Sequence, residues 1–199
     1  MESLLLGDDD DVAQSPPPPS RGPCIPSALD FTDALIRRWF PLVQHIQVAE
    51  LQQIIEANGA NGGGSGGRRL LLLDAREPAE YTVSRIPGAV NVSPSAHTDP
   101  EVVRALVQAA DGGDINNVVV CYCSIGFRSS QLVNALITHR PEYSGRVYNL
   151  EGSIFRWATD GGVLVSGPQE GETAAAHVVH PFNALFGRML DANLRSSAL

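Results

Sequence analysis

Short runs of uninterrupted apolar residues alternate along the chain with segments that repeat apolar residues at helical spacing. Leu70–Leu73 and Val118–Val120 are apolar at every position, which is typical of strands buried on both faces of a parallel sheet. The alternation predicts an α/β fold, a parallel sheet flanked by helices on both faces in a single domain. Strands are predicted within residues 46–48, 70–73, 87–92, 115–122 and 146–150, and helices over 49–57, 101–110, 129–138 and part of 152–161.

Both ends of the chain add elements to this alternation. Residues 28–40 carry apolar side chains at helical spacing between a capping Ser27 and a terminating Pro41, which predicts an N-terminal helix. Residues 181–195 predict an amphipathic α-helix, which we expect to pack on its own domain rather than to mediate dimerisation. Its apolar side would hold Phe182, Leu185, Phe186, Met189 and Leu190.

Composition divides the chain into four parts. Residues 1–27 begin with acidic residues and continue with a run of prolines, and a segment that can bury so little apolar surface is expected to be disordered. We assign residues 28–42 to an N-terminal helical segment, 43–166 to the folded domain and 167–199 to a C-terminal tail with the amphipathic helix. Residues 58–67 are almost all Gly, Asn and Ser, so we interpret them as a surface loop rather than a domain boundary.

The charge of the chain limits its partners. The formal net charge of -8 argues against general binding to nucleic acid or to anionic membranes. No stretch approaches the roughly 20 apolar residues that span a bilayer. A secretory signal needs a basic start and a longer apolar run than Leu4–Leu6, and the acidic run Asp8–Asp11 is unlike a transit peptide. We therefore expect a cytoplasmic protein with neither nucleic-acid nor membrane partners.

The chain has three cysteines, too few and too odd a number for a disulfide scaffold, so reduced thiols are expected. Cys24 lies in the N-terminal segment and is given no role. Cys121 falls inside a predicted strand and is interpreted as a buried core thiol. Its Cα atom and that of Cys123 would lie about 6.5 Å apart in an extended strand, at the edge of disulfide geometry, which disfavours a resolving role for Cys121.

Cys123 opens a loop, CSIGFRS at residues 123–129, between a predicted strand and a predicted helix. Open α/β sheets place their ligand sites at the carboxyl ends of strands. Backbone N–H groups of such a loop, together with the N-terminal end of the next helix, stabilise a thiolate. Gly126 would relieve crowding where the backbone curls, and the Arg128 guanidinium suits an anionic group on a substrate.

A cysteine at the end of a buried strand is by itself most often a small core residue. The glycine and the arginine at these positions of the loop favour the catalytic interpretation instead. We therefore predict Cys123 as the nucleophile. The predicted substrate-binding residues are Ser124, Ile125, Gly126, Phe127, Arg128 and Ser129.

Three motifs, in this order, resemble the rhodanese superfamily of sulfurtransferases in its single-domain form. They are LDAREPAEY at residues 73–81 followed by IPGAVN at 86–91, the loop at 123–129, and VYNLEGSI at 147–154 with Trp157. The resemblance implies a rhodanese-like fold for residues 43–166. It also implies that Asp74 and Arg76 support the active site, either as an ion pair that braces the loop or by direct contact with the substrate.

The chain departs from the family pattern in two places. The family often has Gly-His where this chain has Ser84-Arg85, and a second Gly where this chain has Ser153. We expect neither departure to touch the nucleophile. Four residues separate Cys123 from Arg128, the loop size of sulfurtransferases, whereas phosphatases and arsenate reductases of this fold have one residue more. Those enzymes also tend to have His where this chain has Tyr122, so the resemblance disfavours a phosphatase.

The resemblance implies a two-step sulfur transfer through a persulfide on Cys123. The thiolate would take the outer sulfur of a small anionic donor such as thiosulfate. Cyanide or a thiol, including a protein thiol, would then accept the sulfur. We expect no metal and no organic cofactor in this chemistry. The alternative is a non-catalytic rhodanese-like module that binds a protein partner while its cysteine stays idle.

Five further side chains receive structural interpretations. Glu80 and Arg85 are expected to be solvated or paired surface groups, and Trp157 is expected in the core. His177 and His180 are interpreted as a surface pair, because no other ligand is spaced to join them around a metal ion.

Overall fold

The computed structural model describes residues 27–60, 69–111, 117–167 and 174–197. The expected disorder of residues 1–27 therefore concerns, apart from Ser27, residues outside the described ranges. The same holds for Cys24 and for most of the Gly-rich loop.

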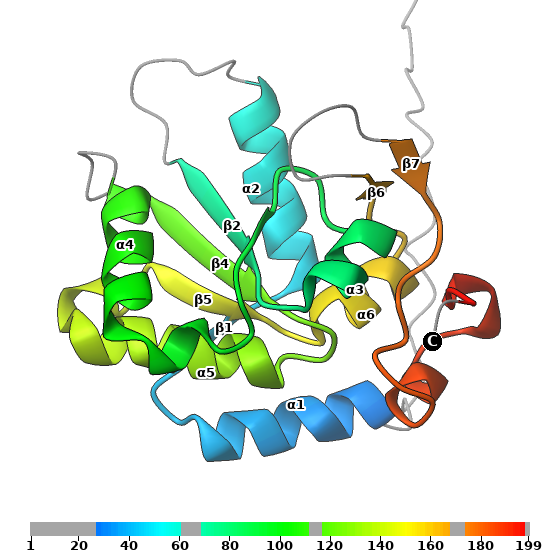
Figure 1. Cartoon of the computed structure of the whole chain (residues 1–199), viewed down its shortest axis with the longest axis horizontal. Coiled ribbons are helices and arrows are strands. Elements are labelled where there is room, and N and C mark those ends of the chain that lie inside the picture. The colour runs from blue at the N-terminus through cyan, green and yellow to red at the C-terminus, as the bar shows by residue number, and fades with distance from the viewer. Residues whose placement is uncertain (1–26, 61–68, 112–116, 168–173, 198–199) are drawn as a thin grey trace, which may run out of the picture.

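A parallel sheet of five strands forms the centre of the molecule, in the order β1-β5-β4-β2-β3 (Figure 1). This order places β4 between β5 and β2, and Tyr122 at the end of β4 pairs with Asp74 at the end of β2. The predicted parallel α/β sheet is confirmed. The strands are β1 (Gln44–Ile46), β2 (Leu70–Asp74), β3 (Val90–Asn91), β4 (Val118–Tyr122) and β5 (Val147–Leu150).

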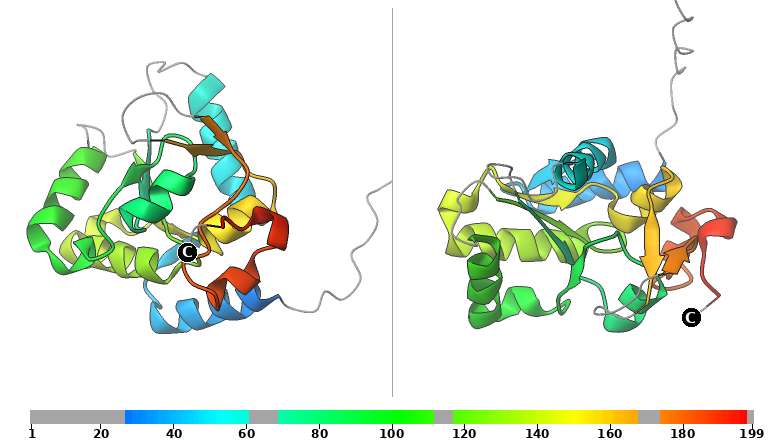
Figure 2. Two further views of the ribbon diagram at one scale, coloured as in Figure 1. Left: turned by 45° about the vertical axis from the view of Figure 1, so that its right-hand side comes forward. Right: turned by 90° about the horizontal axis from the view of Figure 1, so that it is seen from above.

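Helices cover both faces of the sheet, as predicted (Figures 1 and 2). Leu51 of α2 and Phe155 of α6 belong to one buried cluster, and Val103 of α4 and Leu136 of α5 belong to a second. The helices are α1 (Ala28–Trp39), α2 (Val48–Ala60), α3 (Pro78–Val83), α4 (Pro100–Asp111), α5 (Phe127–His139) and α6 (Ser153–Thr159).

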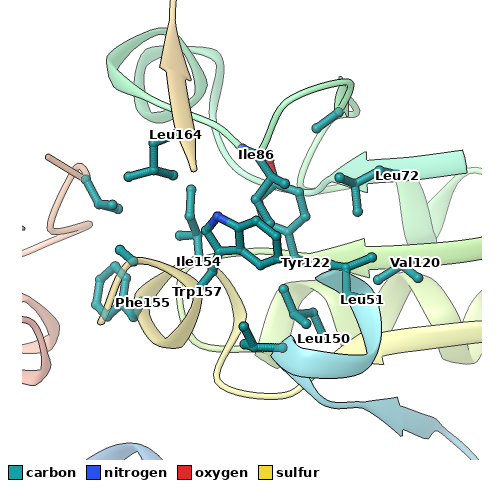
Figure 3. Close-up of a cluster of buried hydrophobic side chains, with 14 of the residues drawn as sticks. Leu51, Leu72, Ile86, Val120, Tyr122, Leu150, Ile154, Phe155, Trp157 and Leu164 are labelled. Carbon is teal, nitrogen blue, oxygen red and sulfur yellow. Dashed lines mark hydrogen bonds between the residues drawn. The ribbon is translucent and has the colours of Figure 1, made fainter. Parts of the chain in front are cut away.

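The apolar run of β4 serves both clusters. Successive side chains of a strand point to opposite faces, so Val120 and Tyr122 join the first cluster while Val119 and Cys121 join the second. This explains why the run shows no alternation of polar and apolar residues. Figure 3 shows the first cluster, in which Trp157 lies beside Tyr122, and the prediction of Trp157 as a core residue is confirmed.

Two helices differ from the sequence prediction. The six-residue helix α3 was not predicted; it begins at Pro78, where the missing N–H of proline is tolerated, and Glu77 and Glu80 form a capping box around its first turn. Helix α5 begins at Phe127, two residues earlier than predicted. Arg128 and Ser129 therefore belong to its first turn, and their side chains have a fixed direction relative to Cys123.

Helix α1 runs along the lower edge of the molecule in Figure 1, below the lower ends of β4 and β5. Ser27 and Asp30 form a capping box at its start, which confirms the predicted cap. The buried Asp33 fastens the helix to the start of α6, because its Oδ1 atom accepts the N–H of Gly152 at 2.9 Å and its Oδ2 atom lies 3.2 Å from Nη2 of Arg156.

The predicted amphipathic α-helix over residues 181–195 is wrong. Phe182 has a φ of 62°, outside the helical region, and the side chain of Asn183 accepts the N–H groups of Leu185 and Phe186 at 3.0 and 2.9 Å. Such local bonds compete with helical ones. The segment instead forms two short 3₁₀ turns, η3 (Phe186–Met189) and η4 (Ala192–Leu194).

The residues before this segment are joined to the domain by a small antiparallel ladder between β6 (Leu164–Ser166) and β7 (Ala174–Ala176). Arg85, expected at the surface, is buried beside it: its backbone exchanges hydrogen bonds of 2.8 and 2.9 Å with Val165, and its guanidinium lies 4.5 Å from the ring centre of Tyr81. Within the described ranges, no helix is long and apolar enough to cross a bilayer.

Candidate active site

Cys123 lies where the sequence places it, directly after β4 and before the first turn of α5. The end of β4 is fixed by Tyr122, whose buried hydroxyl accepts the N–H of Ile86 at 3.2 Å. The backbone carbonyl of Cys123 accepts the N–H of Ile154 at 3.1 Å, which ties the loop to α6. The sulfur is therefore carried on backbone that is held from two sides.

Gly126 shapes the loop around the sulfur. Its N–H donates to the Sγ atom of Cys123 at 3.1 Å, and its φ of 107° lies in the left-handed region that favours glycine. A Cβ atom at this position would lie 3.2 Å from both Asn149 Nδ2 and Ile36 Cδ1. Both the conformation and the close packing therefore require a residue without a side chain.

The pKa of the Cys123 thiol is lowered, although the side chain is almost fully buried. Burial is the largest single influence and acts to raise the pKa. The charge of Arg128 and hydrogen bonds from the N–H and hydroxyl of Ser129 and the N–H of Gly126 outweigh it. The surroundings thus favour the thiolate, as the sequence predicts for this loop.

Cys121 shows what burial does without such partners. It lies inside β4, and burial alone raises its pKa strongly. Both Cys121 and Cys123 are free thiols. The interpretation of Cys121 as a buried core thiol is confirmed.

Glu80 of α3 holds the side chains of the loop in place. Its carboxylate receives two hydrogen bonds from the Arg128 guanidinium, at 2.8 and 3.0 Å, and one from the Ser124 hydroxyl at 2.9 Å. Burial tends to raise the pKa of Glu80, but its bonds to Arg128 outweigh this effect and the pKa is lowered. Glu80 was expected at the surface; it is paired, but buried, with 3% of its surface exposed.

Asp74 and Arg76 form an ion pair beside the loop, and neither side chain has any exposed surface. Nη2 of Arg76 lies 2.6 Å from Oδ2 of Asp74 and also donates to the carbonyl of Ser84 at 2.6 Å. A fully enclosed pair is suited to bracing the end of β2 and the segment before Ile86. This geometry favours the bracing role over direct contact with a substrate.

A chain of polar side chains, missed in the sequence, extends from the loop across two strands. Ser129 donates its hydroxyl to Oδ1 of Asn149 on β5 at 2.6 Å, and Nδ2 of Asn149 lies 3.2 Å from Nδ1 of His45 on β1. Burial, helped by the charge of Arg37, lowers the pKa of His45 to about 4. A neutral His45 can therefore accept the Asn149 amide proton and fix which way that amide points.

Ser153 corrects the expectation that the departures from the family pattern stay clear of the nucleophile. Its Oγ atom accepts the backbone N–H of Cys123 at 3.1 Å and donates to the carbonyl of Leu150 at 3.2 Å. The φ of Ser153 is 51°, a left-handed conformation that glycine adopts more easily. Serine is less stable than glycine in this conformation, but its hydroxyl accepts a hydrogen bond from the backbone of Cys123.

His177 is exposed and His180 half-buried, and Nδ1 of His180 accepts the N–H of Phe182 at 3.1 Å. Across the described ranges, no group of three or more His, Cys, Asp or Glu side chains could hold a metal ion.

The fold and the site together define a parallel α/β protein with an activated thiol at the carboxyl end of its central strand. A family model described as the rhodanese-like domain matches residues 47–160. The match spans more than half of the chain, and the chain belongs to this family.

Three similar proteins illustrate the relationship. The adenylyltransferase and sulfurtransferase MOCS3 of Drosophila virilis is 35% identical over 88 residues, which are 44% of this chain and 18% of that protein. The solved thiosulfate sulfurtransferase of Pseudomonas aeruginosa has a TM-score of 0.51 at 20% identity, over 72% of this chain and 24% of that one. Saccharomyces cerevisiae Ygr203w, a homolog of single-domain rhodanese and of the Cdc25 phosphatase catalytic domain, has a TM-score of 0.49 at 18% identity, over 60% of this chain and 82% of that one. The chain thus spans a quarter or less of the first two proteins.

Proposed function

We propose that this protein is a sulfurtransferase that carries a sulfane sulfur as a persulfide on Cys123. The observation that carries the proposal is a single buried sulfur atom whose pKa is lowered by Arg128, Ser129 and Gly126. Membership of the rhodanese-like family and the 35% identity to a protein named as a sulfurtransferase support it.

In the first step the Cys123 thiolate attacks the outer sulfur of a donor such as thiosulfate. A bond forms between Sγ and that sulfur while the S–S bond of the donor breaks, and the electron pair of the broken bond leaves with sulfite. The terminal sulfur of the persulfide then carries the negative charge. The N–H of Gly126 and the first turn of α5 face this region and would stabilise that charge.

In the second step a nucleophile removes the terminal sulfur. The carbon of cyanide, or a thiolate, attacks it, the bond to Sγ breaks, and the electron pair returns to Cys123 as the thiolate. The two steps restore the protein without an external oxidant or reductant. Covalent storage of the sulfur lets donor and acceptor use the site one after the other.

Arg128 has a different part in this mechanism from the one predicted. The sequence suggested that its guanidinium holds the anionic part of a donor. In the structure the guanidinium is bound on two of its nitrogens by Glu80. We therefore assign to Arg128 the stabilisation of the thiolate, and to Ser124, Ile125 and Phe127 the lining of the donor's path to Cys123.

The test is the intact mass of the protein after incubation with thiosulfate and removal of the excess. We expect a gain of one sulfur atom that cyanide removes as thiocyanate, and Cys123→Ser should keep its fold and show no such gain. A wild-type protein that takes up no sulfur while binding a protein partner stably would favour the non-catalytic module. Turnover of a generic aryl phosphate, which we do not expect, would favour a phosphatase.

A further inference from the structure

A cavity of about 390 Å³ opens directly onto Cys123. The active-site loop forms its floor with Cys123, Ile125 and Phe127. Ser124 and Arg128 of the loop and Thr32 of α1 add polar groups, and large apolar side chains from two other segments form most of the remaining lining. They are Phe31, Leu35 and Trp39 from α1 and Phe182, Phe186 and Met189 from the C-terminal segment.

Both of these segments lie outside the part of the chain that matches the rhodanese-like family, residues 47–160. Figures 1 and 2 show the C-terminal segment lying against α1 next to the sheet. The nucleophile thus belongs to the family domain, whereas the walls in front of it lie outside the family match. The properties of those walls therefore bear on which substrate this chain accepts.

Aromatic contacts join the active-site loop to α1 and to the residue that follows it. The ring of Phe127 packs edge-on against Trp39 and Phe40, with ring centres 5.7 and 5.5 Å apart. Phe31, Trp39 and Phe182 nevertheless remain 66%, 58% and 41% exposed. A group of large exposed apolar side chains around a concave site is typical of a surface that binds an apolar ligand.

The C-terminal segment also covers the charge of the loop. Phe182 adopts a φ of 62°, a strained conformation for a bulky residue, and places its ring 4.7 Å from the guanidinium carbon of Arg128. The same guanidinium donates two hydrogen bonds to the carboxylate of Glu80. Among the described residues that line the cavity, Arg128 is the only charged one apart from the Cys123 thiolate. A small inorganic anion therefore meets a guanidinium whose donors are engaged by Glu80 and whose face is covered by Phe182.

We propose that the cavity binds the apolar body of an organic sulfur donor, a compound whose outer, transferable sulfur is bonded to a second sulfur atom that carries an aryl or branched alkyl group. This inference rests on the proposed sulfur transfer by Cys123. A volume of about 390 Å³ falls in the range of small-molecule sites, and the cavity's opening onto Cys123 lets a bound body present its sulfur to the nucleophile. Burial of an aryl group should lower the barrier for the donor that carries it.

The benzenethiosulfonate and methanethiosulfonate anions test this inference because they share one reacting group. In each, the thiolate of Cys123 bonds to the outer sulfur, the S–S bond breaks, and its electron pair leaves with benzenesulfinate or methanesulfinate. The two donors differ in the phenyl and methyl groups. We expect the second-order rate constant for persulfide formation on Cys123 to be at least about tenfold higher with the phenyl donor, since a single methylene in an apolar pocket already changes rates by about that factor.

Substitutions in the cavity wall test whether the preference for the phenyl donor arises in the cavity. Leu35→Asn places a polar group of similar size on the wall, and Phe31→Ala removes an exposed ring with little risk to folding. We expect each to reduce the ratio of phenyl to methyl rate constants several-fold. Leu185→Ala is the matched control, because Leu185 lies in the C-terminal segment, is 67% exposed and does not line the cavity; its ratio should equal that of the wild type.

The rate constants are obtained from the gain in protein mass over time. Cys123→Ser, which should show no such gain, gives the background. Equal rate constants for the two donors, or a phenyl preference that survives both wall variants unchanged, would overturn the inference while leaving sulfur transfer intact. Absence of sulfur uptake from thiosulfate and from both thiosulfonates would overturn the proposed function, and this inference with it.

Discussion

Cys121 and Cys123 stand two positions apart at the end of β4, and both are buried. Burial raises the pKa of Cys121, whereas hydrogen bonds and the charge of Arg128 reverse that effect at Cys123. The chemistry of the site therefore depends on a few donors within one loop and one helical turn. Ser129 and Gly126 are two of these donors, and a change at each tests its effect on the sulfur.

Ser129→Ala should move the pKa of Cys123 upward. The change removes the hydroxyl that lowers this pKa and whose single proton is shared between the sulfur and Oδ1 of Asn149. A hydrogen bond to a charged group contributes roughly 1.5 to 3 kcal/mol, so alkylation of Cys123 by iodoacetamide should need a higher pH. The measurement is the alkylation rate against pH, read on the peptide that contains Cys123.

Ser130→Ala is the control for this change. Ser130 is the next residue and equally buried, but its hydroxyl has no hydrogen-bond partner. Its pH profile should match that of the wild type. Profiles for Ser129→Ala and the wild type that coincide would show that the Ser129 hydroxyl does not act on the sulfur.

Gly126→Ala should lower both stability and reactivity. At a φ of 107° a side chain is strained, which costs about 1 to 3 kcal/mol, and the new Cβ atom would press on Asn149 and Ile36. Urea denaturation measures the first effect, and alkylation of Cys123 at fixed pH measures the second.

Gly145→Ala separates the two effects. Gly145 also has a positive φ, 94°, but a Cβ atom there would meet nothing within 4 Å. This control should lose stability while keeping the wild-type reactivity of Cys123. Equal reactivity in the two variants would contradict the role given to the Gly126 N–H.

The sequence predicted the nucleophile and its loop because their signal is local: a buried strand, then cysteine, glycine and arginine at fixed positions. It missed Glu80, Asn149 and His45, which come from α3, β5 and β1. They meet the loop only because β5 lies between β1 and β4 and because α3 packs beside β4's carboxyl end. No local sequence pattern indicates which strands lie side by side. The contacts of Glu80, Asn149 and His45 depend on that order, so the sequence could not predict them.

At the scale of elements, the two segments outside the family match were predicted with different success. The spacing of α1 and its Ser27 cap gave a correct helix. The C-terminal segment has similar apolar spacing, but the side chain of Asn183 binds backbone N–H groups that a helix would use. Spacing predicts a helix only where no side chain competes for the backbone, and Asn is among the residues that compete most effectively.

The attachment of α1 should depend on pH through Asp33. Burial, its largest influence, raises the pKa of Asp33 from 3.8 to about 6, so the folded protein takes up a proton more readily than the unfolded one. The contribution of Asp33 to stability is therefore fully present below about pH 4 and lost as the pH rises through about 6, a change on the order of 2 kcal/mol. Urea denaturation of wild type and Asp33→Asn at a series of pH values should show this difference.

Asp160→Asn, at an exposed carboxylate after α6, is the control and should keep the wild-type dependence on pH. If wild type and Asp33→Asn changed in parallel between pH 4 and pH 7, the carboxyl of Asp33 would titrate as an ordinary exposed group does.

At the scale of the whole molecule, the alternation of strands and helices was sufficient for the fold class. It could not reveal that α1 and the C-terminal segment, more than 140 residues apart in the chain, meet in front of Cys123. Where these two segments meet, they form the apolar cavity in front of Cys123. The loop that carries Cys123 itself belongs to the family domain. We therefore assign the proposed activity to the central domain and the proposed choice of donor to the two end segments.

The proposed sulfur transfer requires that the loop keep the sulfur of Cys123 ionised. The most direct measurement is the thiolate absorbance of the whole protein as a function of pH, with the titration of Cys123→Ser subtracted so that Cys24 and Cys121 cancel. We predict a midpoint below the value of about 8.5 that a free cysteine shows. A midpoint at or above that value would mean that Cys123 is a core thiol like Cys121, and the proposed chemistry would be contradicted.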